Sequence, residues 1–287
     1  MSDAIAPAPI DTRPVRLAAL RDALARADLD GLLVTSLANV RYLTGFSGSN
    51  ALLVITAKDC VLLTDFRYAT QVEEEVGEAA TVRIESTNLW TGLWAQLGIL
   101  ASVERIGFES MHLLHRDFAR LLEQGARWSW RPTTDVVEAL RAVKDAGELA
   151  HIEHAVAVAE AALRCTVPLL RAGLTETAVA GILERHLRDA GSEAFPFPTI
   201  VASGPRSALP HARAGGRVLE LGDFVLLDFG AVTAGYCSDI TRTFPVNGKF
   251  SAPQKTLYEI VLNSQAAAIA ATAPGKRFTD GHDAALK

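Results

Sequence analysis

The chain has 287 residues, 49% of them hydrophobic and 21% charged, with a net charge of −5 at pH 7. This length is sufficient for two domains, and the composition is that of a globular protein. The sequence shows no basic footprint and no apolar stretch near the roughly 20 residues of a membrane span, so we expect neither nucleic acid nor membrane as a partner.

The amino terminus and the cysteines indicate the cellular compartment. Residues 1–14 are rich in Ala and Pro without the layout of a signal peptide, so we expect a disordered tail there. The three cysteines, Cys60, Cys165 and Cys237, are widely spaced. We interpret them as buried thiols in a reducing compartment and expect a cytoplasmic protein.

Helix and strand patterns alternate through residues 15–133, which we expect to form an α/β domain. A short turn from Ala57 to Asp59 should join two of the strands into a hairpin. The expected helices span 16–27, 68–76, 89–100 and 113–123, and the expected strands span 31–35, 51–56, 60–64, 81–84 and 105–108.

Residues 134–287 predict a second domain that is richer in helix. We expect nearly continuous helix over 136–171, broken only around Pro168 and Gly173. Further helices should span 175–190 and 253–273, with a strand at 200–203. Thr279 should cap one more helix that begins at Asp280. That last pattern meets no stop signal before Lys287, which we interpret as truncation.

Asp228 and Asp239 are the strongest candidates for chemistry. They lie in two apolar β-rich runs, 224–228 and 238–244, with a turn-like segment at 230–235 between them. A hairpin would bring both carboxylates into one pocket. Carboxylate oxygens suit hard divalent cations, and two metals about 3.5–4 Å apart form a hydrolytic centre. On spacing alone, an ordinary turn aspartate at each position is the alternative.

The motifs around this pair resemble a known family. Residues 209–213 (LPHAR), 226–230 (LLDFG) and 238–244 (SDITRTF) are together similar to the proline-specific metallopeptidases with the pita-bread fold, aminopeptidase P and Xaa-Pro dipeptidase. Residues 41–48 (RYLTGFSG) resemble the amino-terminal domain that this family shares with creatinase. The resemblance implies a creatinase/prolidase-like α/β domain over 15–133 and a pita-bread α+β domain over 134–287 that lacks its carboxyl-terminal part.

The same resemblance implies roles for individual residues. Asp228 and Asp239 match the first two ligands of a site for two divalent ions, Mn²⁺, Zn²⁺ or Co²⁺. His211 matches a catalytic histidine beside the substrate, and Arg213 would either bind and orient the substrate or orient the loop that carries His211. The implied reaction is hydrolysis of the bond between an amino-terminal residue and proline in peptides or dipeptides, by a homodimer.

The sequence departs from the family pattern after the hairpin. The family completes its metal site with a later His and two later Glu residues, whereas His282 and Glu259 are the only His and Glu after Phe244 here. With so few ligands, the repulsion between two cations would be poorly compensated. We therefore expect weak metal binding and impaired hydrolysis by the chain as given.

Two other functions remain as alternatives. Creatinase-like hydrolysis of a C–N bond without metal would use the same fold, but such an enzyme has no need of the carboxylate pair. A non-catalytic pita-bread binding module is the second alternative, and truncation would favour it.

Overall fold

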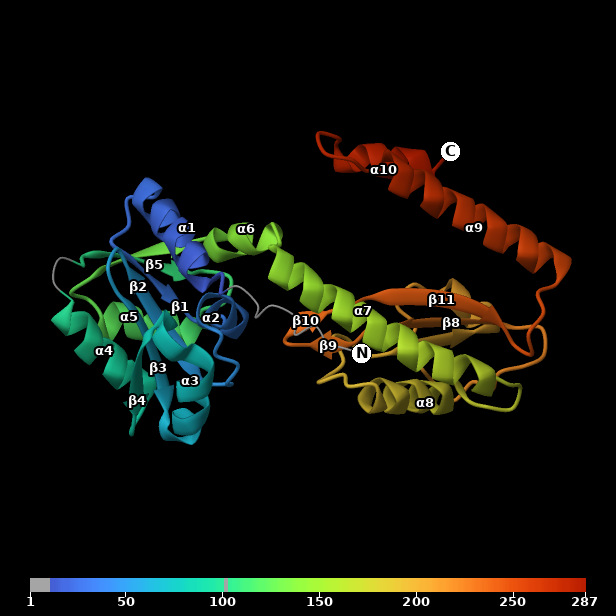
Figure 1. Cartoon of the computed structure of the whole chain (residues 1–287), viewed down its shortest axis with the longest axis horizontal. Helices are drawn as coiled ribbons and strands as arrows, with labels where there is room; N and C mark the ends of the chain where they lie inside the picture. Colours follow the sequence, from blue (N-terminus) through green and yellow to red (C-terminus); the bar gives the residue numbers. More distant parts are fainter. Residues whose placement is uncertain (1–10, 101–102) are drawn as a thin grey trace, which may run out of the picture. The chain divides into compact units, whose positions relative to one another are not determined.

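The computed structural model describes residues 11–100 and 103–287. The chain forms two compact units, Met1–Gly147 and Glu148–Lys287, whose elements are labelled in Figure 1. The boundary lies later than the expected one after Thr133, because residues 134–147 group with the first unit.

The first unit is an α/β domain built on one six-stranded sheet of order β4-β3-β2-β1-β5-β6. Only β2 runs antiparallel to its neighbours, and the other adjacent pairs are parallel. The strands are β1 (Gly31–Val34), β2 (Ala51–Thr56), β3 (Cys60–Asp65), β4 (Thr81–Glu85), β5 (Arg105–Glu109) and β6 (Ser129–Thr133). The helices are α1 (Arg13–Arg26), α2 (Leu37–Thr44), α3 (Ala69–Val76), α4 (Leu89–Ile99), α5 (His115–Gln124) and α6 (Val136–Ala142).

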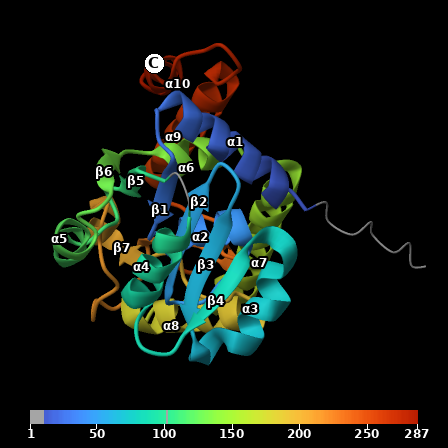
Figure 2. The same ribbon diagram turned by 90° about the vertical axis from the view of Figure 1, so that its left-hand side faces the viewer.

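Helices cover both faces of this sheet, with α1 and α3 on one side and α4 and α5 on the other (Figure 2). Successive strand residues point to opposite faces, so Leu32 packs in the core beneath α1 and α3, while Leu33 packs beneath α4 and α5. Both side chains are fully buried. This two-sided burial explains the continuous apolar runs of β1, β2 and β3.

Most expected elements of the first unit are confirmed, but α2 and β6 were not predicted. The Glu109 carboxylate, distant in sequence, accepts hydrogen bonds from the Thr35 and Ser36 amides at 2.6 and 2.7 Å and so satisfies the start of α2. The edge strand β6 is mostly exposed and contains Pro132, so it shows no strand pattern.

The expected disordered tail at 1–14 needs correction at its described end. Residues 1–10 lie outside the described residues. Arg13 and Pro14 belong to α1, and the Arg13 guanidinium donates to the Thr44 and Glu75 carbonyls at 2.9 and 3.0 Å. Residues 13–14 are therefore part of the fold.

The expected break of the 136–171 helix around Pro168 is confirmed, since α7 (Ala146–Thr166) ends there in a 3-10 turn at Val167–Leu169. A second break, at 143–145 between α6 and α7, was not predicted. Asp145 in the break accepts a 2.6 Å hydrogen bond from Arg16 of α1. This tertiary contact between distant residues explains why local helix propensity did not reveal the break.

The second unit packs α7 and α8 (Glu176–Asp189) against a three-stranded antiparallel sheet of order β11-β8-β7. Its strands are β7 (Ile200–Ser203), β8 (Phe224–Phe229) and β11 (Ile240–Pro245), with a separate ribbon of β9 (Val232–Thr233) and β10 (Tyr236–Cys237). Val225, Leu227 and Phe229 of β8 are fully buried in the core with both helices. By strand alternation, Asp228 lies on the opposite face of the sheet.

The last two helices, α9 (Ala252–Ala271) and α10 (Phe278–Ala285), pack on each other and have no buried residue (Figure 1). The start of α9 is held by Phe250, whose ring contacts Phe224 and Tyr258. The predicted cap at Thr279 was wrong, since α10 begins two residues before Asp280. The Asp280 carboxylate accepts from the Arg277 amide at 3.0 Å and makes Arg277 the capping residue.

Two of the three cysteines contradict the expectation of buried thiols. Cys60 is buried, whereas Cys165 and Cys237 are exposed free thiols. Cys165 lies off the buried stripe of α7, and Cys237 lies on the two-residue strand β10. None of the helices formed by the described residues is both long and apolar enough to span a bilayer.

Candidate metal centre and the loop that carries His211

The hairpin expected from the sequence is formed by β8 and β11, which pair antiparallel with Asp228 opposite Thr241. The β9–β10 ribbon fills the connection between them, and Asp239 immediately precedes β11. Gly230 allows the chain to close here, since a Cβ at this position would lie 1.9 Å from the Ser238 carbonyl oxygen. The close passage of the two chain segments places Asp239 next to the end of β8.

The carboxylates of Asp228 and Asp239 are neighbours. Burial raises the pKa of Asp228, and the negative charge of Asp239 raises it further. The Thr241 hydroxyl donates to Asp228 Oδ1 at 2.9 Å and acts on this pKa in the opposite direction. Asp228 is half-buried and Asp239 is exposed. A cation between them would relieve this repulsion.

The donor set therefore fits two ligands of a divalent cation, since carboxylate oxygens are what hard cations prefer. It does not complete a site: within residues 11–100 and 103–287, no group of three or more His, Cys, Asp or Glu side chains is arranged to hold a metal ion. The structure thus brings together the predicted pair and, in its described part, adds no third ligand.

His211 and Arg213 lie on a different segment of the chain from this pair. Both side chains are exposed, on the segment that follows β7 and a 3-10 turn at Gly204–Ala208. In the part of the chain that the structure describes, neither side chain forms a hydrogen bond or ion pair with Asp228 or Asp239. The Arg213 carbonyl accepts a 2.6 Å hydrogen bond from Arg206, which fixes the backbone two residues after His211.

A buried carboxylate that the sequence analysis missed anchors this segment. Glu176 is fully buried at the start of α8. Its Oε1 accepts from the amide and the hydroxyl of Ser203, both at 2.9 Å. Its Oε2 accepts from Arg206 Nε at 3.1 Å and from the Gly215 amide at 3.2 Å. Glu176 thereby ties both ends of the 203–215 loop to one helix terminus.

The only sequence signal for Glu176 was its place directly after Thr175, where a helix was expected to start. The Thr175 hydroxyl caps this helix by accepting from the Ala178 amide at 3.1 Å. Acidic residues are common in the first turn of exposed helices. Its burial depends on Ser203, Arg206 and Gly215, which are remote in sequence.

The chain thus combines an α/β domain with a second unit that carries a carboxylate hairpin, and comparisons with known proteins identify the class of protein that has this arrangement. Residues 16–143 match the creatinase/prolidase N-terminal domain, and residues 150–287 match metallopeptidase family M24. The chain belongs to metallopeptidase family M24, with a creatinase/prolidase amino-terminal domain and a pita-bread domain, and is a peptidase by family.

Individual relatives agree with this assignment. An uncharacterized peptidase of Bacillus subtilis is 37% identical over 261 residues, which cover 91% of this chain and 73% of that protein. An Xaa-Pro dipeptidase of Pyrococcus horikoshii is 32% identical over 250 residues, which cover 86% of this chain and 68% of that protein. The solved Xaa-Pro dipeptidase from Bacillus anthracis superposes with a TM-score of 0.84 at 34% identity, covering 90% of this chain and 71% of that one.

Proposed function

We propose that this chain cleaves the peptide bond between an amino-terminal residue and proline. Family membership and the similarity to Xaa-Pro dipeptidases support a peptidase. The observation that carries the proposal is the adjacency of Asp228 and Asp239 at the end of a hairpin in such a chain. An Xaa-Pro bond lacks the amide N–H that most peptidases bind, so its recognition needs dedicated groups.

Asp228 and Asp239 are proposed as ligands of divalent ions, with Mn²⁺, Zn²⁺ and Co²⁺ as candidates. When bound, such an ion lowers the pKa of a coordinated water to about 7 and supplies the nucleophile. We further propose that the 287-residue chain binds metal weakly and hydrolyses slowly. Its described residues provide two neighbouring carboxylates, while each ion usually takes three or more protein ligands.

His211 and Arg213 are proposed to act on the substrate rather than on the metal. The exposed imidazole of His211 can donate a hydrogen bond to the oxygen on which negative charge develops. The Arg213 guanidinium is exposed while its backbone is held through Arg206, so the cation is available to a peptide carboxylate.

We also propose that the protein acts as a cytoplasmic homodimer. The free thiols Cys165 and Cys237 are exposed, a state that a reducing compartment preserves. Size-exclusion chromatography with light scattering would give the mass of the protein in solution. The mass of a monomer at micromolar concentration would contradict the dimer.

The proposed activity is tested by supplying Mn²⁺, Zn²⁺ or Co²⁺ with Ala-Pro, Ala-Pro-Ala and creatine as substrates. Two proteins should be compared: the 287-residue chain, and the same chain continued with the carboxyl-terminal part of the Bacillus subtilis relative. We expect metal-dependent Ala-Pro cleavage that is slow in the first and fast in the second.

Each other outcome points to a different function. Metal-independent turnover of creatine would favour the creatinase-like alternative. No turnover of any substrate by either protein, with both folded, would favour a binding module. Cleavage of Ala-Pro-Ala at the same rate as Ala-Pro would define an aminopeptidase rather than a dipeptidase.

A further inference from the structure

The position of Asp239 depends on a ribbon that is too short to be stable by itself. The connection from β8 to β11 contains β9 and β10, which pair antiparallel through Thr233 with Tyr236 and Val232 with Cys237. A single two-stranded hairpin is marginally stable in water even at ordinary strand length. Contacts with the rest of the second unit must therefore fix the ribbon and the aspartate that follows it.

Three hydroxyl groups, two from the ribbon and one from the residue after it, donate hydrogen bonds to α7, which passes alongside β9 and β10 (Figure 1). The donors and acceptors are the Tyr236 hydroxyl with Glu148 Oε1 at 3.0 Å, the Thr233 hydroxyl with the His151 carbonyl at 3.1 Å, and the Ser238 hydroxyl with the Ala155 carbonyl at 3.0 Å. The acceptors are spaced by three and then four residues, so they lie on one face of the helix. We call these three bonds the hydroxyl ladder.

Burial makes the hydroxyl ladder specific. Thr233 and Ser238 are only 5% and 4% exposed. Because buried polar groups in folded proteins are paired, each of these hydroxyls selects one position of the ribbon along α7. The Tyr236 ring adds a stacked contact with the His151 ring, with the ring centroids 5.4 Å apart. The ribbon is therefore held at one place on the helix.

Ser238 is the member of the hydroxyl ladder nearest to the metal centre. Its hydroxyl oxygen also accepts from the Ala231 amide at 3.0 Å, and its own amide donates to the Ala231 carbonyl at 2.9 Å. Ser238 thereby joins the end of β8, the start of β11 and α7 at one point. Asp239 follows this point directly, and Asp228 lies three residues before Ala231.

The contacts on the other side of the ribbon involve its earlier part. Ser192 Oγ accepts from the Val232 amide at 3.0 Å, and the Glu193 carboxylate accepts from the Ala234 amide at 2.6 Å. These bonds fix β9 and the turn that follows it. The hydroxyl ladder, in contrast, reaches β10 and Ser238, the residues that lead into Asp239.

We propose that Ser238 is a positioning residue of the metal centre, through which α7 sets the place of the Asp239 carboxylate beside Asp228. This inference rests on the proposed role of the two aspartates as metal ligands. Ser238 acts through Asp239 and not as a ligand, so loss of its hydroxyl displaces a ligand without removing one. Metal affinity depends on such supporting hydrogen bonds as well as on the ligands themselves.

The first measurement is the Mn²⁺ affinity of the ¹⁵N-labelled 287-residue chain, read from broadening of the Asp228 and Asp239 amide signals. Ser238→Ala should lower this affinity about tenfold, as expected for a lost supporting contact. Tyr236→Phe keeps the aromatic ring and removes one hydroxyl farther from Asp239, so it should lower the affinity by about threefold.

Thr166→Val is the matched control. Thr166 is fully buried, and its hydroxyl also donates to a carbonyl of α7, that of Ala162 at 2.8 Å, but it is not part of the hydroxyl ladder. The substitution should lower the melting temperature, since it removes a buried hydrogen bond, and leave the Mn²⁺ affinity unchanged.

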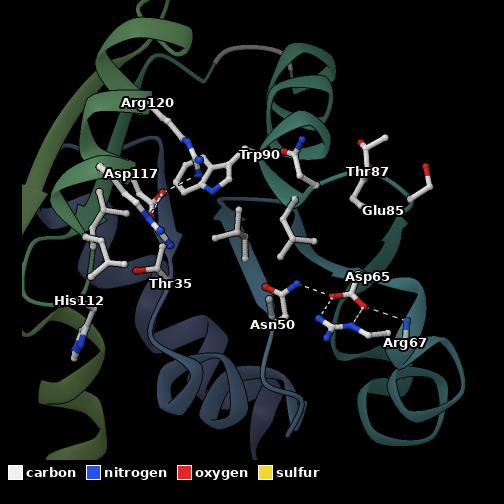
Figure 3. A pocket seen from close by; sticks show the side chains of 18 of the residues that line it. Thr35, Asn50, Asp65, Arg67, Glu85, Thr87, Trp90, His112, Asp117 and Arg120 are labelled. Carbon is white, nitrogen blue, oxygen red and sulfur yellow. Dashed lines mark hydrogen bonds and ion pairs between the residues drawn. The ribbon is translucent and has the colours of Figure 1, made fainter.

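A pocket of about 550 Å³ in the first unit provides an internal reference for the titration (Figure 3). The Asp65 and Asp117 carboxylates line it, and each accepts from an arginine, Arg67 at 2.8 Å and Arg120 at 2.9 Å. Because these carboxylates are already paired with cations, Mn²⁺ should broaden their amide signals only at higher concentrations than those of Asp228 and Asp239.

The second measurement needs no metal. The residual dipolar coupling of the Asp239 amide reports the orientation of that N–H bond in the metal-free protein. The coupling should differ from the native value in Ser238→Ala and match it in Thr166→Val. If Ser238→Ala does not fold, the same two measurements on Tyr236→Phe and on Thr233→Val decide the question.

The two measurements separate failure of this inference from failure of the metal site. Native Mn²⁺ affinity or a native Asp239 coupling in Ser238→Ala would overturn the positioning role. An equal loss of affinity in Thr166→Val would also overturn it, because general stability would then explain the effect. Broadening of Asp65 as readily as Asp228 in the native chain would overturn the metal site, and the coupling would still decide whether Ser238 positions Asp239.

Discussion

Thr241 lies directly across the strand pair from Asp228 and donates a 2.9 Å hydrogen bond to its Oδ1. The bond ties one carboxylate oxygen to β11 and leaves the other oxygen, Oδ2, available. A metal ligand held in this way has a fixed orientation. Removing such a supporting hydrogen bond typically lowers the affinity for the metal by about 10–100-fold. The hairpin thus provides a ligand together with the group that orients it.

Thr241→Val should therefore weaken Mn²⁺ binding about tenfold without unfolding the second unit, because the isosteric side chain removes only the hydroxyl. Thr241→Ser should retain the affinity. Thr243→Val is the matched control, since Thr243 lies two residues along the same strand and forms no side-chain hydrogen bond among the described residues. Equal Mn²⁺ affinities of Thr241→Val and Thr243→Val would contradict the orienting role.

The anchor at Glu176 predicts a large effect on stability. Glu176→Gln replaces a buried carboxylate that accepts from Ser203, Arg206 and Gly215 and leaves the Arg206 charge without its partner. We expect the free energy of unfolding to fall by about 3 kcal/mol in urea denaturation. Glu220→Gln should cost less than about 0.5 kcal/mol, because its side chain is exposed and its ion pair spans 3.9 Å.

Hydrogen exchange separates this anchor from a general loss of stability. Amides of the 203–215 loop should exchange faster in Glu176→Gln than amides of β8, which the substitution does not touch. Uniform acceleration across the second unit would mean that Glu176 does not act on the His211 loop in particular.

The Asp30–Arg105 pair predicts a pH dependence in the first unit. The Arg105 side chain donates to Asp30 at 2.9 Å, and with the Arg105 amide it holds the pKa of Asp30 at about 2, below the usual 3.8. Because the folded pKa is depressed, this stabilisation is present above pH 4 and is lost as pH falls toward 2. Thermal unfolding of the native chain and of Asp30→Asn should differ at pH 5 and converge between pH 4 and 2.

Asp22 supplies the control for this titration, since it is exposed and has no ion pair among the described residues. Asp22→Asn should leave the melting temperature unchanged across the same pH range. A gap between the native chain and Asp30→Asn that stays constant down to pH 2 would mean that Asp30 is not stabilised in its charged form.

The two units should differ in resistance to proteolysis. The first has a core on each face of its sheet, whereas α9 has no buried residue and exposes Leu257, Ile260 and Val261 by 53–60%. Limited trypsin digestion should remove α9 and α10 first and leave a stable fragment that ends near Gly147. A chain in which α9 is as resistant as the first unit would show that this helix is held more firmly than its contacts indicate.

The parts of the fold that sequence could predict are those that local pattern determines. The apolar runs of β1, β2 and β3 identified the central strands because burial on both faces leaves no polar alternation. The start of α2 could not be found, since the carboxylate that satisfies it belongs to Glu109, over seventy positions along the chain. The break at Asp145 likewise depends on Arg16.

The candidate site divides in the same way. The hairpin that joins Asp228 and Asp239 could be predicted because its two runs and its turn are contiguous in sequence. Glu176 could not, since its role comes from burial beneath Ser203 and Arg206. The exposure of Cys237 was also missed, because a two-residue ribbon gives no pattern from which burial can be inferred.

The central claim, that Asp228 and Asp239 bind a divalent cation, is tested most directly by paramagnetic broadening with Mn²⁺. This measurement detects weak binding and uses the 287-residue chain itself. Substoichiometric Mn²⁺ should broaden the amide signals of Asp228, Asp239 and Thr241 before any others, and Asp228→Asn or Asp239→Asn should abolish that broadening. Broadening centred elsewhere, or unchanged in both variants, would contradict the assignment of these two carboxylates as metal ligands.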